Sequence, residues 1–193
     1  MLFNSLGFVL LFLPLTLVGY YALIGFRRQQ YIFFYLVLNS LAFYAVWNPP
    51  YVLLLGASVL VNYGFGLLIE RQEKRGSTAK GRVLFLGIAI NLVVLGWFKY
   101  ANFFVDNLNA LGTSFHLERI ILPLAISFYT FQQIAFLVDV ARGEVRTGGI
   151  WRYTTFVIFF PQLIAGPIVH YKEMMPQFFG RNLGRFWSAD MII

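Results

Sequence analysis

Polar side chains able to do chemistry gather in two stretches of a largely apolar chain. The first stretch, 122–139, carries Gln132, Gln133 and Asp139 among apolar and aromatic residues. The second stretch, 159–174, carries Gln162 and His170, and Gly166 lies between them at a break in the backbone pattern. Amide, carboxylate and imidazole groups in an apolar segment hydrogen-bond neighbouring helices or line a watery cavity. Both interpretations stay open, and these six residues are our candidates for lining a cavity or substrate site.

The spacing of the candidates limits what they can do. Gln132 and Asp139 are seven residues apart. They therefore share one helix face, about 10 Å apart along the axis. Arg142 follows Asp139 by three residues, which predicts a local ion pair within the helix.

Neither histidine has the surroundings of a catalytic base. His170 lies beside Tyr171 and Lys172, a setting typical of a membrane boundary. His116 is the weaker candidate for a catalytic base. The sequence contains no metal-ligand cluster, no nucleophile with its base and no phosphate-binding loop. We therefore expect no catalytic residue, no metal ligand and no bound cofactor within this chain.

The composition is that of a membrane protein. Of the 193 residues, 59% are hydrophobic and only 12% are charged, about half the charged share of a soluble domain. The absence of cysteine excludes disulfides and thiolate chemistry. The net charge is +7, but no nucleic-acid-binding motif accompanies it. We expect membrane lipid, and not nucleic acid, as a partner.

Six apolar segments are candidates for crossing the bilayer, which takes about 20 residues. They predict an all-α, polytopic transmembrane helix bundle in the cell (inner or plasma) membrane. The second is short, and Pro123 is predicted to start the fifth helix. The segments are 3–25, 31–47, 51–69, 83–98, 120–141 and 153–169.

Basic residues between these segments predict the orientation, because Lys and Arg accumulate in cytoplasmic loops. With the N-terminus outside, ten of them lie in inner loops: Arg27, Arg28, Arg71, Lys74, Arg75, Lys80, Arg82, Arg142, Arg146 and Arg152. Only Lys99 and Arg119 lie in outer loops. The outer loop 99–119 is predicted as a short interfacial excursion, with one helix lying at the membrane surface as the form that stays open.

The segment 159–170 is predicted to be interrupted. Pro161 and Pro167 bracket Gly166 in an apolar run, and each proline disrupts a helix interior. Broken backbone at membrane depth is tolerated when it is buried in protein or lines a watery cavity. We expect a re-entrant element or a helix broken at a functional crevice, and a simple kinked span stays open as the alternative. A re-entrant element would return Lys172, Arg181 and Arg185 to the cytoplasmic side.

The same stretches resemble a known family. The runs LPLAISFYTFQQIAFLVDVARGE (122–144) and FFPQLIAGPIVHYKEMMPQF (159–178) are similar to the membrane-bound O-acyltransferases, alginate O-acetyltransferase branch. The opening MLFNSLGFVLLFLP and the run WFKYANFF (97–104) also resemble this branch. Two long motifs in this order are highly specific, and the resemblance covers essentially the whole chain.

The resemblance implies a bundle enclosing a funnel through the membrane. In such a family a cytoplasmic acyl donor, acetyl-CoA or an acyl carrier, meets an extracytoplasmic sugar hydroxyl at a histidine acting as general base. Periplasmic or extracellular acetyltransferase partners are also implied. The family's catalytic histidine lies in the second half of a longer chain. We therefore expect residues 1–193 to be the N-terminal part of one transmembrane domain, inactive without its C-terminal catalytic half.

Two other classes stay open on the residues alone. A broken element in a membrane bundle also suits a transporter or channel subunit. A non-enzymatic scaffold of a polysaccharide export complex is the third hypothesis.

Overall fold

The computed structural model describes residues 5–24, 29–112, 116, 118–167 and 169–178. Within these ranges the chain forms helices and no strand, which confirms the predicted all-α bundle. The elements are η1 (Phe8–Phe12), α1 (Leu13–Ile24), α2 (Gln29–Trp47), α3 (Pro49–Lys74), α4 (Ala79–Ala110), α5 (Ile126–Ala141), α6 (Ile150–Ile158), α7 (Phe160–Ala165), α8 (Tyr171–Met174) and η2 (Met175–Phe178).

Three of these helices are long and apolar enough to cross a membrane. They cover Gln30–Trp47, Pro49–Lys74 and Ala79–Ala110. Phe8–Leu23 and Ile126–Ala141 are shorter apolar helices. Many large apolar side chains of the bundle are exposed, including Leu53, Phe85 and Val93. Lipid tails can solvate such faces, and water cannot do so without cost.

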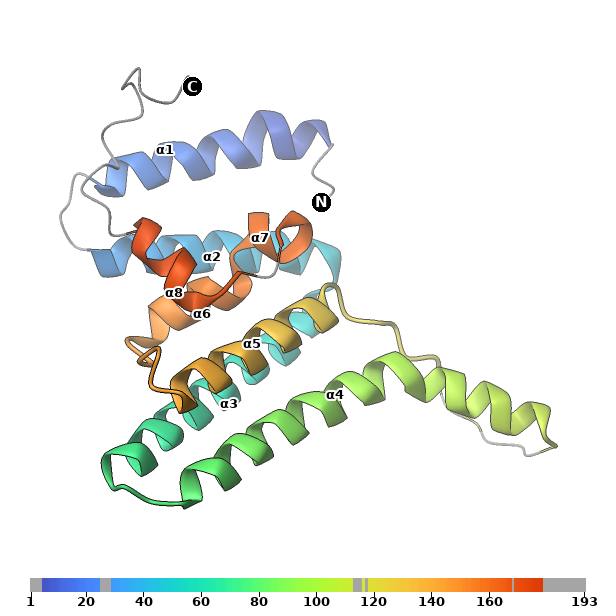
Figure 1. Cartoon of the computed structure of the whole chain (residues 1–193). Coiled ribbons are helices and arrows are strands. Elements are labelled where there is room, and N and C mark those ends of the chain that lie inside the picture. Colours follow the sequence, from blue (N-terminus) through green and yellow to red (C-terminus); the bar gives the residue numbers. More distant parts are fainter. Residues whose placement is uncertain (1–4, 25–28, 113–115, 117, 168, 179–193) are drawn as a thin grey trace, which may run out of the picture.

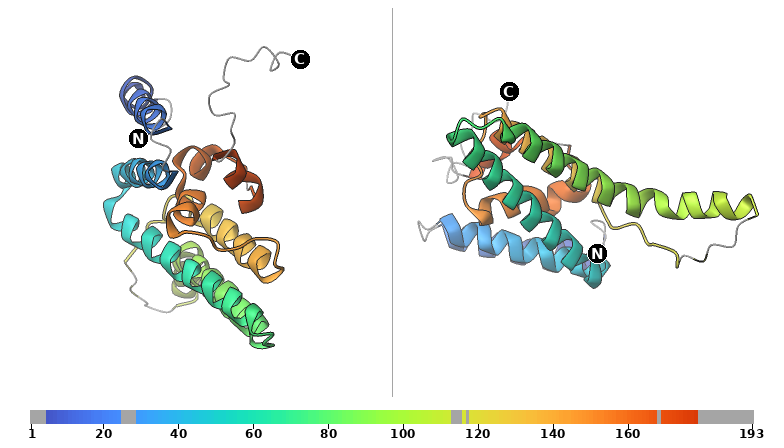
Figure 2. Two further views of the ribbon diagram at one scale, coloured as in Figure 1. Left: turned by 90° about the vertical axis from the view of Figure 1, so that its left-hand side faces the viewer. Right: turned by 90° about the horizontal axis from the view of Figure 1, so that it is seen from below.

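Helix α4 differs from the prediction for 99–119. It continues as one helix of 32 residues to Ala110, and its C-terminal part projects beyond the other helices (Figure 1, Figure 2). Asn107, inside the predicted excursion, donates its side-chain amide to the carbonyl of Phe103 one turn earlier. Asn102 bonds the backbone of Ile120 in both directions. The asparagines therefore support the helix and its connection to the returning chain.

Helix α5 begins later than Pro123, at Ile126. Ala125 precedes the helix in the left-handed conformation, with φ of 57°. The hydroxyl of Tyr44 donates to the carbonyl of Leu124 at 3.0 Å, and that of Tyr51 donates to the carbonyl of Ile121. These bonds hold 121–125 in non-helical form, so the helix is 16 residues long.

The segment 150–178 enters the bundle and turns back. Helix α6 has nine residues, about 14 Å, less than half of a bilayer core of about 30 Å. Phe159 interrupts the helix, and Pro161 lies in the first turn of α7. After Gly166 the chain returns to α8, which lies at the same end of the bundle as the start of α6 (Figure 1). The predicted break is confirmed, and the chain folds back on itself here. We call the segment 150–178 the re-entrant element.

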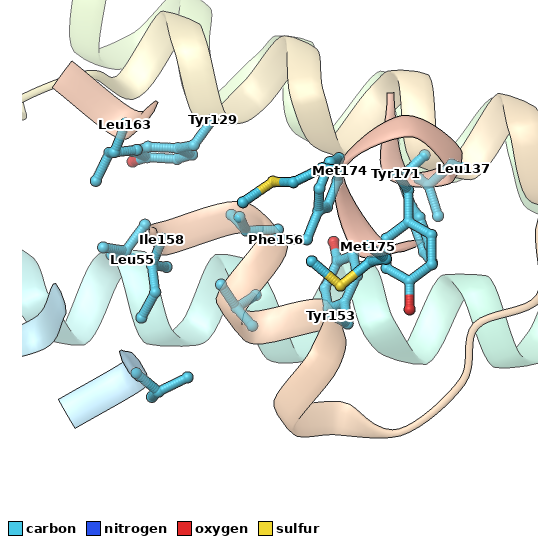
Figure 3. Packing of buried hydrophobic residues seen from close by; sticks show 14 of the residues in the cluster. Leu55, Tyr129, Leu137, Tyr153, Phe156, Ile158, Leu163, Tyr171, Met174 and Met175 are labelled. Carbon is cyan, nitrogen blue, oxygen red and sulfur yellow. The ribbon is translucent and has the colours of Figure 1, made fainter. Parts of the chain in front are cut away.

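The core forms where this element packs on α5 and α3. The rings of Tyr153, Phe156 and Tyr171 pack against the ring of Phe136. Met174 and Met175 belong to the same cluster, close to Tyr153, Phe156 and Tyr171 (Figure 3). The re-entrant element is therefore a buried part of the fold.

The helix ends alternate in a way that fits the charge pattern. The turn after α3 and the loop after α5 lie at one end of the bundle, while the connection from α4 to α5 lies at the other (Figure 1). The first end carries the basic loops 70–82 and 142–152.

We expect reporter fusions at Gly76 and Gly149 to be cytoplasmic and a fusion at Gly112 to be outside, because Lys and Arg concentrate at the first end. Paired alkaline phosphatase and green fluorescent protein fusions measure this. A cytoplasmic signal from Gly112 would contradict the topology.

Candidate functional site

The polar face of α5 points at α3 and α6. Gln133 donates to the hydroxyl of Ser58 at 2.9 Å and accepts from the hydroxyl of Tyr153 at 3.1 Å. Gln132 donates to the carbonyl of Phe156 at 3.0 Å. Both glutamines are fully buried. These bonds join three helices, which is the role that polar side chains play between membrane helices.

The same face retains unused hydrogen-bonding capacity. Within the described residues, Oε1 of Gln132 and the hydroxyl of Tyr129 are buried without a partner. A buried polar atom without a hydrogen bond costs about 1–3 kcal/mol. Gln132 therefore joins helices through its amide nitrogen, while its oxygen remains available to a ligand or water. Both the helix-joining interpretation and the cavity-lining interpretation of this residue are therefore supported.

Asp139 and His170 form a pair that the sequence did not suggest. Nδ1 of His170 lies 2.9 Å from Oδ2 of Asp139. The Asp139 side chain is only 4% exposed, whereas that of His170 is 45% exposed. The prediction that Asp139 pairs with Arg142 is wrong, because Arg142 faces Glu144 instead, at 4.0 Å. The sequence around His170 shows no partner that would make it a base, whereas the structure places the carboxylate of Asp139 against its ring.

This pair has the geometry of an oriented imidazole. When Nδ1–H donates to the carboxylate, Nε2 of the neutral ring is left as an acceptor on the exposed side. The carboxylate fixes the ring at the point where the chain leaves the re-entrant turn. The arrangement can hold the element in place and can accept a hydrogen bond from a ligand.

Gln162 and Gly166 shape the turn itself. The side chain of Gln162 reaches the carbonyl of Pro167 at 3.5 Å, and the Gly166 N–H donates to the carbonyl of Gln162 at 2.9 Å. Gly166 is extended, with φ of −89° and ψ of 159°. These two candidates contact each other, and they lie on α7 and its C-terminal turn, apart from the glutamines of α5.

Known proteins match the chain over nearly its full length. The alginate O-acetylase of Pseudomonas putida, described as probable, is 42% identical over 188 residues, which is 94% of this chain and 38% of that protein. The peptidoglycan O-acetyltransferase of Helicobacter pylori is 39% identical over 94% of this chain and 39% of its own length.

The chain is homologous to part of the alginate O-acetylases. The resemblance to that branch of the membrane-bound O-acyltransferases is thereby confirmed. The teichoic acid D-alanyltransferase of Lacticaseibacillus rhamnosus is 27% identical to this chain. The match covers 80% of this chain and 36% of the length of that protein. No family model and no solved structure matches. The chain spans less than two fifths of the length of these relatives.

This alginate O-acetylase homologue also has a polar contact that our sequence reasoning missed. Asn62 of α3 and Asn91 of α4 exchange side-chain hydrogen bonds of 3.1 and 2.6 Å, and both are buried. The signal was present, since each is an isolated amide in an apolar segment. Their pairing required the register of the two helices.

Replacing Gly166 by Ala should destabilise this homologue. An added Cβ would lie 2.8 Å from Cα of Gln162 and 2.7 Å from its Cγ, and the first of these is backbone that cannot rotate away. Such overpacking costs about 1–3 kcal/mol, and about 1 kcal/mol lowers an unfolding midpoint by about 2–4 °C in a chain of this size.

Scanning fluorimetry in detergent measures the midpoint. The matched control is Gly56→Ala on α3, where an added Cβ meets nothing within 4 Å and alanine favours the helix. Equal midpoints for the two variants would show that the turn does not need glycine.

Proposed function

We infer that this chain is the N-terminal part of one transmembrane domain of an O-acyltransferase. The whole enzyme would move a short acyl group, in the first instance acetyl, to a hydroxyl of an exported polysaccharide. The observation that carries this proposal is the 42% identity to a probable alginate O-acetylase over 94% of the chain.

The residues of the chain would then form the wall of the reaction path. A re-entrant element buried in the bundle leaves polar backbone at membrane depth, which is tolerated where it faces protein or a watery cavity. Gln162 and Gly166 lie at its turn, and His170 lies where the chain leaves that turn. Gln132, Gln133 and Asp139 lie on the face of α5 that the element covers. We assign all six to positioning or lining, and we place the general base outside these 193 residues.

The donor would be acetyl-CoA or an acyl carrier on the cytoplasmic side. The acceptor hydroxyl and a periplasmic or extracellular acetyltransferase partner would lie on the other side. This arrangement requires the inner or plasma membrane and a bundle with its N-terminus outside. The ten basic residues of the proposed inner loops support that orientation.

Acetyl transfer in membranes tests the proposal. Residues 1–193 alone should transfer no acetyl group to alginate or another polysaccharide, because the base and the groups that orient the alcohol would be missing. The same residues joined in frame to the remaining length of the Pseudomonas putida relative should transfer it. Transfer by the 193 residues alone, or no transfer by a well-expressed fusion protein, would contradict the assignment.

A further inference from the structure

A basic cavity lies at the end of the bundle where the re-entrant chain returns. It has a volume of about 580 Å³, within the range of small-molecule sites. Its walls come from the loop after α5, from α6 and from α8. The charged residues among its lining are Glu144, Arg146, Arg152 and Lys172.

The side chains that line this cavity carry a net positive charge. One of them, the guanidinium of Arg146, is available to bind an anion. Glu144 is engaged by Lys172 at 2.5 Å. The Lys172 ammonium holds the pKa of the Glu144 carboxyl below its usual range, and Glu144 in turn raises the pKa of Lys172. Both groups are therefore charged near neutral pH. Arg152 lies over the ring of Phe33. Arg146 is exposed and forms no ion pair with any described residue.

A tyrosine hydroxyl is also available at the wall. Tyr171 is 9% exposed and lines the cavity, and its hydroxyl has no hydrogen-bond partner in the described part of the chain. It faces Gly148, where an added Cβ would lie 3.3 Å from the hydroxyl oxygen and where φ is +61°. A side chain at 148 would crowd this donor.

The loop that forms the wall is held in place from α3. The hydroxyl of Tyr63 donates to the carbonyl of Gly148 at 2.9 Å, and the carboxylate of Glu70 accepts from the Thr147 N–H. Because the loop is fixed at 147 and 148, Arg146 is presented from a preorganised backbone. Preorganisation lowers the entropic cost of binding.

We propose that this cavity binds a phosphate group, with Arg146, Arg152 and the hydroxyl of Tyr171 as its donors. Guanidinium groups match the geometry of phosphate oxygens, and a tyrosine hydroxyl adds a neutral donor. The phosphate would belong either to the soluble acyl donor or to an anionic lipid headgroup. The assignment of the phosphate to the soluble acyl donor rests on the proposed function. The cavity adjoins the re-entrant turn, since Lys172 of its wall follows His170 by two residues.

Direct binding tests this without relying on acyl transfer. The protein is placed in nanodiscs of neutral phosphatidylcholine and titrated with adenosine 3′,5′-bisphosphate or with dioctanoyl phosphatidylglycerol. Arg146→Gln should raise the Kd of the ligand that binds by about tenfold, as expected for the loss of a charged hydrogen bond. Tyr171→Phe should raise it several-fold without altering the fold. Arg75→Gln, an exposed arginine at the same end but outside the cavity, is the matched control.

The two ligands distinguish the source of the phosphate. Binding of the bisphosphate that depends on Arg146 supports a soluble donor, and binding of the lipid alone with the same dependence supports a headgroup. Binding by neither ligand, or an equal loss in Arg75→Gln, would overturn the phosphate site. Binding by the protein joined in frame to the second half of the Pseudomonas putida relative, without acetyl transfer by that protein, would count against the proposed function alone.

Discussion

His170→Gln should lower acetyl transfer less than tenfold in the extended protein, by which we mean residues 1–193 joined in frame to the remaining length of the Pseudomonas putida relative. In the same protein, substitution of the second-half histidine that the family resemblance identifies as general base should lower transfer by about 10² to 10⁴, the usual contribution of such a base. The reason lies in the Asp139–His170 geometry. The glutamine amide can still donate to the buried carboxylate of Asp139, so the position of the turn is preserved.

The measurement is the rate of acetyl incorporation into polysaccharide at matched protein levels in membranes. Gly56→Ala serves as a control that touches neither histidine. Loss of transfer in His170→Gln as large as that in the second-half variant would overturn our placement of the base. It would make His170, oriented by Asp139, a catalytic residue.

His170→Leu should destabilise the protein, although His170→Gln should not. Leucine offers no donor, so the carboxylate of Asp139, 4% exposed, would lose the one side-chain hydrogen bond that it accepts from a described residue. Leaving such an acceptor unsatisfied costs about 1–3 kcal/mol. The 45% exposure of His170 favours the lower end, because water can reach the vacated side.

A double substitution separates this effect from lost packing. Asp139→Asn combined with His170→Leu should recover part of the loss, because a neutral amide is cheaper to bury than a charged carboxylate. Unfolding midpoints of the two single variants, the double variant and His170→Gln measure it. Equal midpoints for His170→Leu and His170→Gln would show that the hydrogen bond to Asp139 contributes nothing.

Several features of this protein followed from local sequence. Apolar runs of about 20 residues predict membrane helices whatever their neighbours are. The break at 159–170 was predictable because Pro161 and Pro167 act on their own backbone. The polar character of Gln132 and Gln133 indicated contacts between helices, because an amide in an apolar segment must find a partner.

Other features required the tertiary structure. Asp139 has Arg142 three residues away, but its partner is His170, 31 residues along the chain. Gln133 joins Ser58, 75 residues earlier, to Tyr153. Such pairs depend on how far the re-entrant chain penetrates before it turns and on the register of α5 against α3.

The outcome for Asp139 has a simple physical reason. By itself the sequence determined the membrane class of this protein, its all-α character and the position of the break. Helical periodicity also states which residues share a face. Periodicity contains no information on what packs against that face. The loop after α5 turns Arg142 toward Glu144, while Gly166 and Pro167 direct the returning chain back to the end of α5. Only that packing brings an imidazole against the buried carboxylate of Asp139.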